Sequence, residues 1–133
     1  MTDDALVLDS SAVVAVLLDE SGADALIARM ERASRVAIAA PTVVEAGIVL
    51  RARAGPVGGE LLDDLLRTLD AIVVPFDPDH AAAALAAWTR YGRGRHPAAL
   101  NLGDCIAYAT AQLAGLPLLA RGDDFRRTDL ALA

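Results

Sequence analysis

Ala5-Leu6-Val7-Leu8-Asp9-Ser10-Ser11 begins the first recognisable element of this chain. Its four apolar residues, with the β-branched Val7 among them, predict a short buried strand that ends at an acid. The apolar run 12–18 that follows predicts a helix. In open α/β sheets, ligands bind where a strand ends and a helix begins. The competing interpretation is that Asp9 or Ser10 caps the helix, because a side-chain oxygen there accepts from free backbone N–H groups.

The composition predicts one domain spanning residues 1–133. Of its 133 residues 55% are hydrophobic, which is enough for a core without disulfides. All 12 basic residues are arginine, so mechanisms that need a lysine amine are excluded. The net charge of −6 does not attract nucleic acid, and such a partner would require a local arginine patch or a bound cation. The single cysteine, Cys105, excludes an internal disulfide and a cysteine-based zinc site.

The N-terminal residues and the hydropathy pattern predict a cytoplasmic protein without membrane contact. Met1-Thr2-Asp3-Asp4 is acidic, unlike a signal peptide. No apolar run approaches the ~20 residues that a membrane span needs. A single cysteine also fits a reducing compartment.

Apolar runs alternate with helical patterns along the chain. Strands are predicted at 5–8, 36–40, 71–76 and 118–120, and helices at 12–18, 23–31, 42–54, 60–70, 78–90 and 102–114. Between the last two helices lies a polar insertion, 91–97, and the tail 121–129 is predicted to be a polar loop or turn. This alternation is typical of an α/β fold with a four-stranded parallel sheet flanked by helices on both faces.

Acidic residues follow three of the predicted strands. Asp9 ends the first, Glu45 lies in the first turn of the helix after the second, and Asp123-Asp124 follow the fourth. Because the carboxyl ends of parallel strands share one edge, we expect these carboxylates to gather there. Asp104 opens another helix, and sequence order alone does not place it at that edge.

Such a cluster predicts a divalent cation. Neighbouring carboxylates repel one another, and some would have to take up protons without a counter-ion. Oxygen ligands without a histidine or cysteine cluster favour Mg²⁺ or Mn²⁺ over zinc.

Each acid also has a purely structural interpretation. Thr42-Val43-Val44-Glu45 matches a capping box, in which the glutamate reaches back to the N-cap amide. Asp104, three residues after Asn101, suits the positive end of a helix dipole. Asp123-Asp124 fits a solvated turn.

The order and spacing of four motifs resemble a PIN domain, specifically a VapC-type toxin of a type II toxin–antitoxin pair. The motifs are Val7-Leu8-Asp9-Ser10-Ser11-Ala12, Thr42-Val43-Val44-Glu45-Ala46, Asn101-Leu102-Gly103-Asp104-Cys105 and Leu118-Leu119-Ala120-Arg121-Gly122-Asp123-Asp124-Phe125, with Thr128-Asp129 after the last. Together they extend over nearly the full length of the chain.

The resemblance implies a PIN-like fold, a homodimer, and Mg²⁺-dependent endonuclease action on RNA, either transfer or ribosomal. It places Asp104 beside Asp9 and Glu45. It favours Asp124 as the fourth acid, with Asp123 as the alternative. It also implies a VapB-type antitoxin that covers the site and often inserts an arginine into the acids. Promoter DNA is bound only through that antitoxin.

A mechanism follows from this site. We expect Asp9 and Asp104 to hold the metal directly, and Glu45 and Asp124 to ligate it through water or to hold a second ion. The metal then activates a water for attack on phosphate, without a protein nucleophile. Ser10 or Ser11 is expected to bind a phosphate or to orient Asp9, with helix capping as the alternative.

Arginines supply the candidate RNA contacts. Arg93 and Arg95, in the insertion with Tyr91 and two glycines, can bind phosphates and adapt to folded RNA. An ordinary solvated loop is the alternative, and a second candidate patch consists of Arg121, Arg126 and Arg127. His96 is expected at the surface, Trp88 in the core or at a dimer interface, and Cys105 in packing.

Other classes of α/β protein fit less well. A receiver-type phosphoacceptor domain needs a lysine, and this chain has none. A phosphatase of the haloacid-dehalogenase kind needs a second aspartate where Ser11 stands. A non-catalytic domain whose acidic edge docks a basic peptide remains the alternative function.

Overall fold

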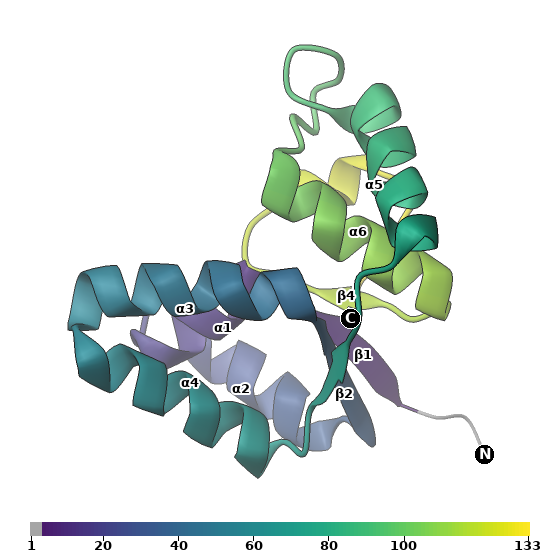
Figure 1. The fold of residues 1–133 in the computed structure, drawn as a ribbon. Helices are drawn as coiled ribbons and strands as arrows, with labels where there is room; N and C mark the ends of the chain where they lie inside the picture. The colour runs from purple at the N-terminus through teal and green to yellow at the C-terminus, as the bar shows by residue number, and fades with distance from the viewer. Residues whose placement is uncertain (1–3) are drawn as a thin grey trace.

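A computed structural model describes residues 4–133 of the chain (Figure 1). The sheet is four-stranded, in the order β3-β2-β1-β4, with parallel pairing throughout. Its strands are Ala5–Leu8 (β1), Arg35–Ala39 (β2), Ile72–Val74 (β3) and Leu118–Leu119 (β4). The predicted four-stranded parallel sheet is therefore confirmed, although its third and fourth strands are shorter than predicted.

Helices connect the strands and cover the sheet. They are Ser10–Leu17 (α1), Ala23–Arg32 (α2), Ala40–Ala54 (α3), Pro56–Thr68 (α4), Pro78–Tyr91 (α5) and Leu102–Ala114 (α6). A short 3₁₀ turn, Asp124–Arg127 (η1), lies in the tail that was predicted to be a polar loop or turn. Among the described residues, no helix is both long and apolar enough to cross a bilayer.

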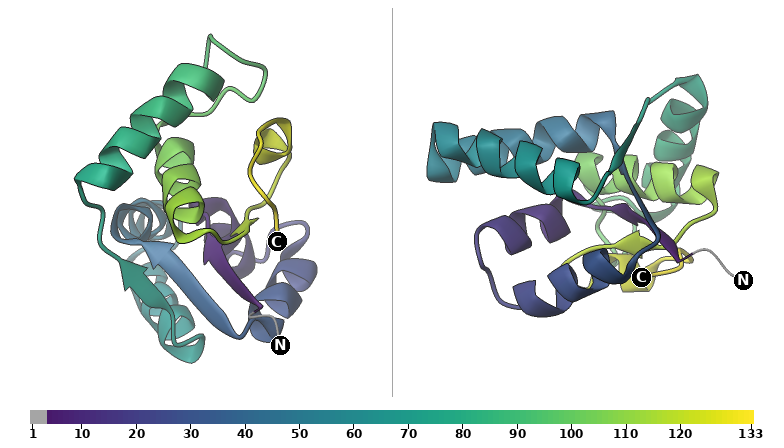
Figure 2. Two further views of the ribbon diagram at one scale, coloured as in Figure 1. Left: turned by 90° about the vertical axis from the view of Figure 1, so that its right-hand side faces the viewer. Right: turned by 90° about the horizontal axis from the view of Figure 1, so that it is seen from below.

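The side chains of β1 alternate between two hydrophobic cores, as the period of a strand requires. Leu6 and Leu8 belong to a core shared with α1 to α4. Val7 belongs to a second core, formed with α5, α6 and Phe125. Figure 2 shows α5 and α6 on one side of the sheet and the remaining helices on the other. Helices therefore cover both faces, as the alternating sequence pattern predicted.

The start of α3 differs from the prediction, which began the helix at Thr42. The helix begins at Ala40, with Pro41 in its first turn, where a proline loses no hydrogen bond. Thr42 is consequently inside the helix and buried, and its hydroxyl finds no partner among the residues that the structure describes. The capping-box interpretation of Thr42 and Glu45 is wrong, and Glu45 lies in the second helical turn instead of the first.

The boundary between α3 and α4 also differs. Gly55-Pro56 was predicted to stop one helix well before the next began at residue 60. Gly55 has a φ of 70°, which reverses the chain, and Pro56 is already the first residue of α4. Both helices then pack against the same core.

Candidate active site

Asp9 is a buried carboxylate at the carboxyl end of the central strand. Its side chain is 3% exposed and accepts from the backbone N–H of Ser11 at 3.1 Å, so it caps α1. Burial raises the pKa of Asp9 to about 6; the hydrogen bonds from Ser11 oppose this shift, and the charges of Asp104 and Glu45 add to it. Asp9 is thus both a helix cap and a member of an acid cluster.

Ser11 links the ends of two strands. Its hydroxyl donates to Asp9 Oδ2 at 2.5 Å and accepts from the backbone N–H of Arg121 at 2.9 Å. Arg121 follows β4, and its side chain donates to the carbonyl of Ser21 at 3.0 Å. These bonds fit the interpretation that Ser11 orients Asp9. Phosphate binding by Ser10 or Ser11 stays a prediction.

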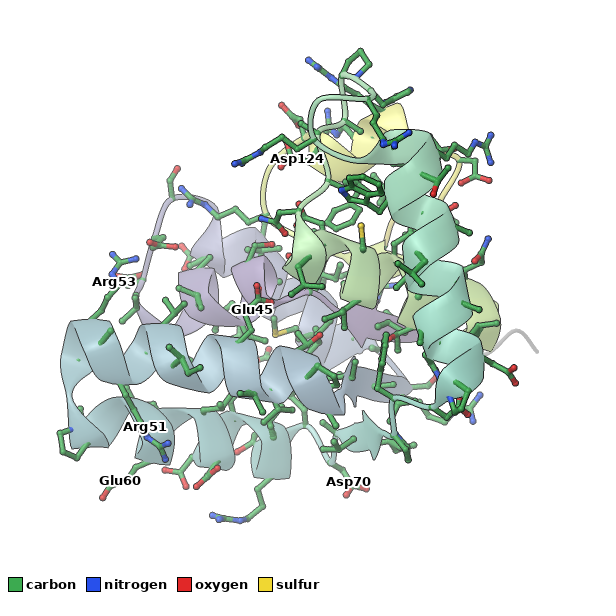
Figure 3. All side chains as sticks on the ribbon, turned by 45° about the horizontal axis from the view of Figure 1, so that its top comes forward. Glu45, Arg51, Arg53, Glu60, Asp70 and Asp124 are labelled. Carbon is green, nitrogen blue, oxygen red and sulfur yellow. The ribbon has the colours of Figure 1, made fainter. Side chains whose placement is uncertain are left out.

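Glu45 reaches this edge from the second turn of α3. Its carboxylate lies against Gly103 of α6, where a Cβ, if residue 103 had one, would stand 2.1 Å from Glu45 Oε2. Only a residue without a side chain therefore leaves room for Glu45. Figure 3 shows Glu45 on the side of α3 toward Asp124, whereas Arg51, Glu60 and Asp70 lie on another side.

Asp104 is the third residue of α6 and lies in its first turn, as the structural interpretation predicted, and it also forms a capping box with Asn101 that was not predicted. Its Oδ2 accepts from the Asn101 amide at 3.0 Å, and Asn101 Oδ1 accepts from the Asp104 amide at 2.9 Å. Burial raises the pKa of Asp104, and the charges of Asp124 and Glu45 raise it further, while the Asn101 amide and Arg93 lower it. The same carboxylate therefore caps its helix and belongs to the acid cluster.

The fourth acid is contributed by the tail. The charge of Asp124, which opens η1, acts on Asp104. Asp123 is directed elsewhere, since its carboxylate pairs with Arg126 at 3.4 Å. This placement favours Asp124 over Asp123, and the identity of the fourth acid stays a prediction.

The acid cluster, defined as Asp9, Glu45, Asp104 and Asp124, suits a divalent cation by its chemistry. Within residues 4–133, no three histidine, cysteine, aspartate or glutamate side chains converge tightly enough to hold a metal ion in this arrangement. Two of the carboxylates are turned toward helix-capping amides. The donors are nonetheless all oxygens, and two of the acids carry raised pKa values that a cation would lower.

Arg93 and Arg95, the arginines of the insertion, lie in different settings. The charge of Arg93 acts on Asp104. Arg95 instead lies over the ring of Trp88, with its guanidinium carbon 4.4 Å from the ring centroid. Arg127 of η1 donates to the carbonyl of Pro97 at 3.2 Å, which joins the second arginine patch to the insertion. RNA binding by Arg93 and Arg95 stays a prediction.

Three other side chains are now placed. Cys105 is buried in packing, as predicted. His96 is half-buried, accepts from the Ala98 amide at 3.0 Å and packs edge-on against Tyr91, so it is less exposed than predicted. Trp88 is 42% exposed, which excludes a place in the core of this chain because α5 turns it outward.

Two further residues received no role from the sequence but make notable contacts in or near this site. Gly103 was quoted only within a motif, although its missing side chain makes room for Glu45. Asp129, also part of a quoted motif, binds three side chains from α5 and α6. The signal that could have indicated Asp129 is an acid shortly after the apolar Phe125 in an otherwise polar tail.

A model of the PIN domain matches residues 6–130 of this chain. The chain belongs to the PIN domain family. Among the relatives of this PIN domain, Ribonuclease VapC36 of Mycobacterium tuberculosis is 48% identical over 126 residues, which cover 94% of this chain and 91% of the relative. Ribonuclease VapC of Mycolicibacterium smegmatis is 42% identical over 126 residues, covering 95% and 98%. These relatives are named ribonucleases, which cleave phosphodiester bonds. The prediction that the chain is an enzyme of this class is therefore confirmed.

Solved structures resemble this PIN domain over almost its whole length. VapC20 of Mycobacterium tuberculosis, described as a sarcin-ricin loop cleaving toxin, has a TM-score of 0.80 at 14% identity and covers 96% of this chain and 98% of its own. A toxin–antitoxin complex from Klebsiella pneumoniae has a TM-score of 0.73 at 20% identity, with 96% of each chain covered. These likenesses confirm the PIN-like fold.

Proposed function

We propose that this PIN domain is a Mg²⁺-dependent endoribonuclease, the toxin of a VapBC type II toxin–antitoxin pair, which cleaves structured RNA. The observation that carries the proposal is the acid cluster, in which burial and mutual repulsion raise the pKa values of Asp9 and Asp104. Supporting it, relatives at 42–48% identity are named VapC ribonucleases. A transfer or ribosomal RNA is the proposed substrate, and Mn²⁺ is the alternative cation.

Each side chain of the site has a separate role in this proposal. Asp9 and Asp104 would hold the cation, with Glu45 and Asp124 ligating through water or at a second ion. When bound, the cation stabilises charge on the phosphate and activates water for attack. Ser11 fixes the orientation of Asp9 through its 2.5 Å hydrogen bond. Arg93, beside Asp104, is suited to a backbone phosphate of the RNA.

The proposed protein partners are a VapB-type antitoxin and a second copy of this chain. Solved structures with the same fold include toxin–antitoxin complexes. The antitoxin supplies any contact with DNA. In the alternative, non-catalytic function, the acid cluster only binds such a basic partner. A guanidinium of the partner can offset the negative charge of the cluster as a metal ion does.

Homodimerisation is proposed to use an apolar surface of α3, α5 and α6. Val44, Ile48, Leu85 and Leu102 expose between 61% and 76% of their surface there. Their grooves adjoin each other through Phe76, Leu102 and Ile106. Contiguous exposed apolar patches of this kind mark interaction sites. We expect Ile48→Glu to give a monomer by light scattering, whereas Val57→Glu, on α4, leaves a dimer.

The test of catalysis is RNA cleavage by purified protein. Total transfer RNA and ribosomal RNA are incubated with Mg²⁺, with Mn²⁺ or with EDTA. Asp9→Asn and Asp104→Asn are assayed beside Asp64→Asn, an exposed acid of α4 that pairs with Arg67. We expect discrete, metal-dependent cuts by the wild type and by Asp64→Asn, and their loss in the two cluster variants.

The opposite result has a defined meaning. Folded wild-type protein that binds the cation but leaves both RNA classes intact would contradict the nuclease proposal. The basic-partner function would then be the better account. Cleavage that persists in EDTA would contradict the metal requirement alone.

A further inference from the structure

Asp124 is held by less regular structure than the other acids. Asp9 follows the central strand and Asp104 belongs to a capped helix, but Asp124 follows β4, which has 2 residues, and opens η1, which has 4. The residues between them, 121–123, are exposed, and Gly122 has a φ of +98°. Apart from the bonds of Arg121 to Ser11 and Ser21, the position of Asp124 therefore depends on contacts made by the residues after it.

The first of these contacts is apolar. Phe125 is 4% exposed and lies in the second core with Tyr91 and Tyr108. Thr128 closes the turn, because its hydroxyl donates to the Phe125 carbonyl at 2.7 Å and accepts from the Leu130 amide at 3.2 Å. The turn η1 is thus a closed unit that carries Asp124 at one end.

Asp129 ties that unit to both helices of the second layer. Its backbone N–H donates to the Tyr91 hydroxyl at 3.2 Å. Its carboxylate accepts from Arg90 Nη1 at 3.3 Å and, through the other oxygen, from the Tyr108 hydroxyl. Arg90 and Tyr91 end α5, whereas Tyr108 lies within α6. We call Asp129, Arg90, Tyr91 and Tyr108 the tail latch.

Tyr108, the residue by which the tail latch contacts α6, lies close in the helix to Asp104 of the acid cluster. Asp104 and Tyr108 are four residues apart in one helix and therefore lie on the same side of it. A bond between Asp129 and Tyr108 consequently fixes the tail relative to the side of α6 that bears Asp104. The acid cluster and the tail latch therefore each include a residue of the same helix, α6.

The protonation states of Tyr108 and Asp129 fix which of them donates in their hydrogen bond. Burial and the bond to Asp129 raise the pKa of the Tyr108 hydroxyl, and that bond lowers the pKa of Asp129. At neutral pH Tyr108 is therefore the donor and Asp129 the charged acceptor, which is the stronger form of a hydrogen bond.

We infer that Asp129 is a positioning residue, which holds η1 on Tyr108 and Tyr91 and so sets the place of Asp124 beside Asp104. The inference rests on the proposed function of the acid cluster. The hydrogen bonds and the ion pair of Asp129 within residues 4–133 reach none of the cluster acids, and Asp129 acts through Phe125 and Thr128.

The test compares Tyr108→Phe, Asp129→Ala and Asp129→Asn with Thr110→Val. Thr110 is buried in α6, and its hydroxyl bonds within the helix, to the Ile106 carbonyl at 2.8 Å, so its loss matches the loss of a helix hydroxyl without touching the latch. Two quantities are measured on the full chain: hydrogen exchange of a peptide covering 123–130, and kcat and KM for RNA cleavage with Mg²⁺.

We expect Tyr108→Phe and Asp129→Ala to accelerate exchange in that peptide about tenfold, because the turn opens locally, while peptides of β1 exchange as before. We expect kcat to fall about tenfold and KM to stay within about twofold, since misplacing a catalytic group by a fraction of an ångström affects the chemical step. Asp129→Asn keeps an oxygen for Tyr108 and should retain most of the activity. Thr110→Val should resemble the wild type in both measurements.

Unchanged exchange and kcat in Tyr108→Phe and Asp129→Ala would overturn the inference, as would an equal loss in Thr110→Val. If Tyr108→Phe does not fold, Arg90→Gln, which removes the ion pair at 3.3 Å, is expected to show the same changes at smaller size. A wild-type protein that cuts no RNA would contradict the proposed function instead, and the exchange measurement would still decide whether the latch holds the turn.

Discussion

Asp9 shows that capping and membership of an acid cluster are compatible at a single residue. Its carboxylate accepts from the Ser11 amide, as a cap does, and its pKa is raised by burial and further by neighbouring acids. Asp104 combines the same two roles. Helix capping and proximity to other acids therefore coexist at these two residues, because a cap fixes the orientation of the side chain. Metal binding by Asp9 and Asp104 stays a prediction.

Burial of Asp9 should make the cation-free protein less stable at neutral than at acidic pH. Its pKa is about 6 in the folded chain against an ordinary value of 3.8, so the folded state binds the proton more tightly. The stability gained from this tighter proton binding is fully present below about pH 4 and is lost as the pH rises to about 6. Above that pH the stability no longer changes through Asp9. Asp9→Asn should gain about 3 kcal/mol in the free energy of unfolding near pH 7.5 and little near pH 4.

Urea unfolding in EDTA at those two pH values measures this difference. A variant that is no more stable than the wild type near pH 7.5 would show that the bonds from Ser11 outweigh the cost of burying the charge. The variant Asp64→Asn, at an exposed site, should show no such dependence on pH.

Gly103 offers a separation of activity from stability. In Gly103→Ala the new Cβ would stand 2.1 Å from Glu45 Oε2, so the flexible glutamate must move. Helix propensity favours the alanine, and we expect the free energy of unfolding to change by less than about 1 kcal/mol. RNA cleavage should fall at least about tenfold. Gly47→Ala, whose Cβ meets Leu62 at 3.6 Å, is the matched control and should cleave normally; equal activity of the two variants would contradict the role of Glu45.

At the scale of elements, the sequence predicted every strand and the helices between them, because apolar runs and helical periods are local signals. The boundaries at Pro41 and Pro56 were misjudged. The predicted helices begin at residues 42 and 60, after these prolines, whereas both prolines lie in the first turn of a helix. Local patterns identify an element more reliably than they locate its ends.

The revised start of α3 leaves Thr42 with a buried hydroxyl that lacks a partner in the described part of the chain. Thr42→Val keeps the shape and removes this polar atom, so we expect a gain of about 1 kcal/mol in the free energy of unfolding. Thr110→Val removes a hydroxyl that is bonded to Ile106 and should instead be neutral or destabilising. Thermal unfolding of both variants checks the prediction, and a loss in Thr42→Val would show that its hydroxyl is satisfied.

The site was less predictable than the fold, for a physical reason. Asp9, Glu45 and the tail acids could be assigned to one sheet edge, because strand order fixes where parallel strands end. The neighbourhood of Asp104 came from a family resemblance, since the insertion before α6 has no periodic pattern. The bonds of Asp129 join residues that are 21 and 38 positions apart, and no local signal reports such pairs.

At the scale of the whole molecule, we expect the net charge of −6 and the acid cluster to make stability depend on cations. A ligand that binds only the folded state stabilises it by mass action. Mg²⁺ at about 100 times its Kd should therefore add about 2.7 kcal/mol to the wild type. Titration of the melting temperature measures this, and the gain should vanish in Asp104→Asn but persist in Asp64→Asn. An equal gain in both variants would indicate nonspecific screening.

The short strand β4 and the tail that follows it have a consequence for synthesis of the protein. Because translation runs from the N-terminus, Asp9 leaves the ribosome well before Asp124 and its latch residue Asp129. The first layer, with α1 to α4, can form from the earlier part of the chain, since Leu119 is the one buried member of its described core that comes from beyond α4. A chain that is still being made can therefore present Asp9 without Asp124, and the four acids of the cluster can come together only after the tail has been made.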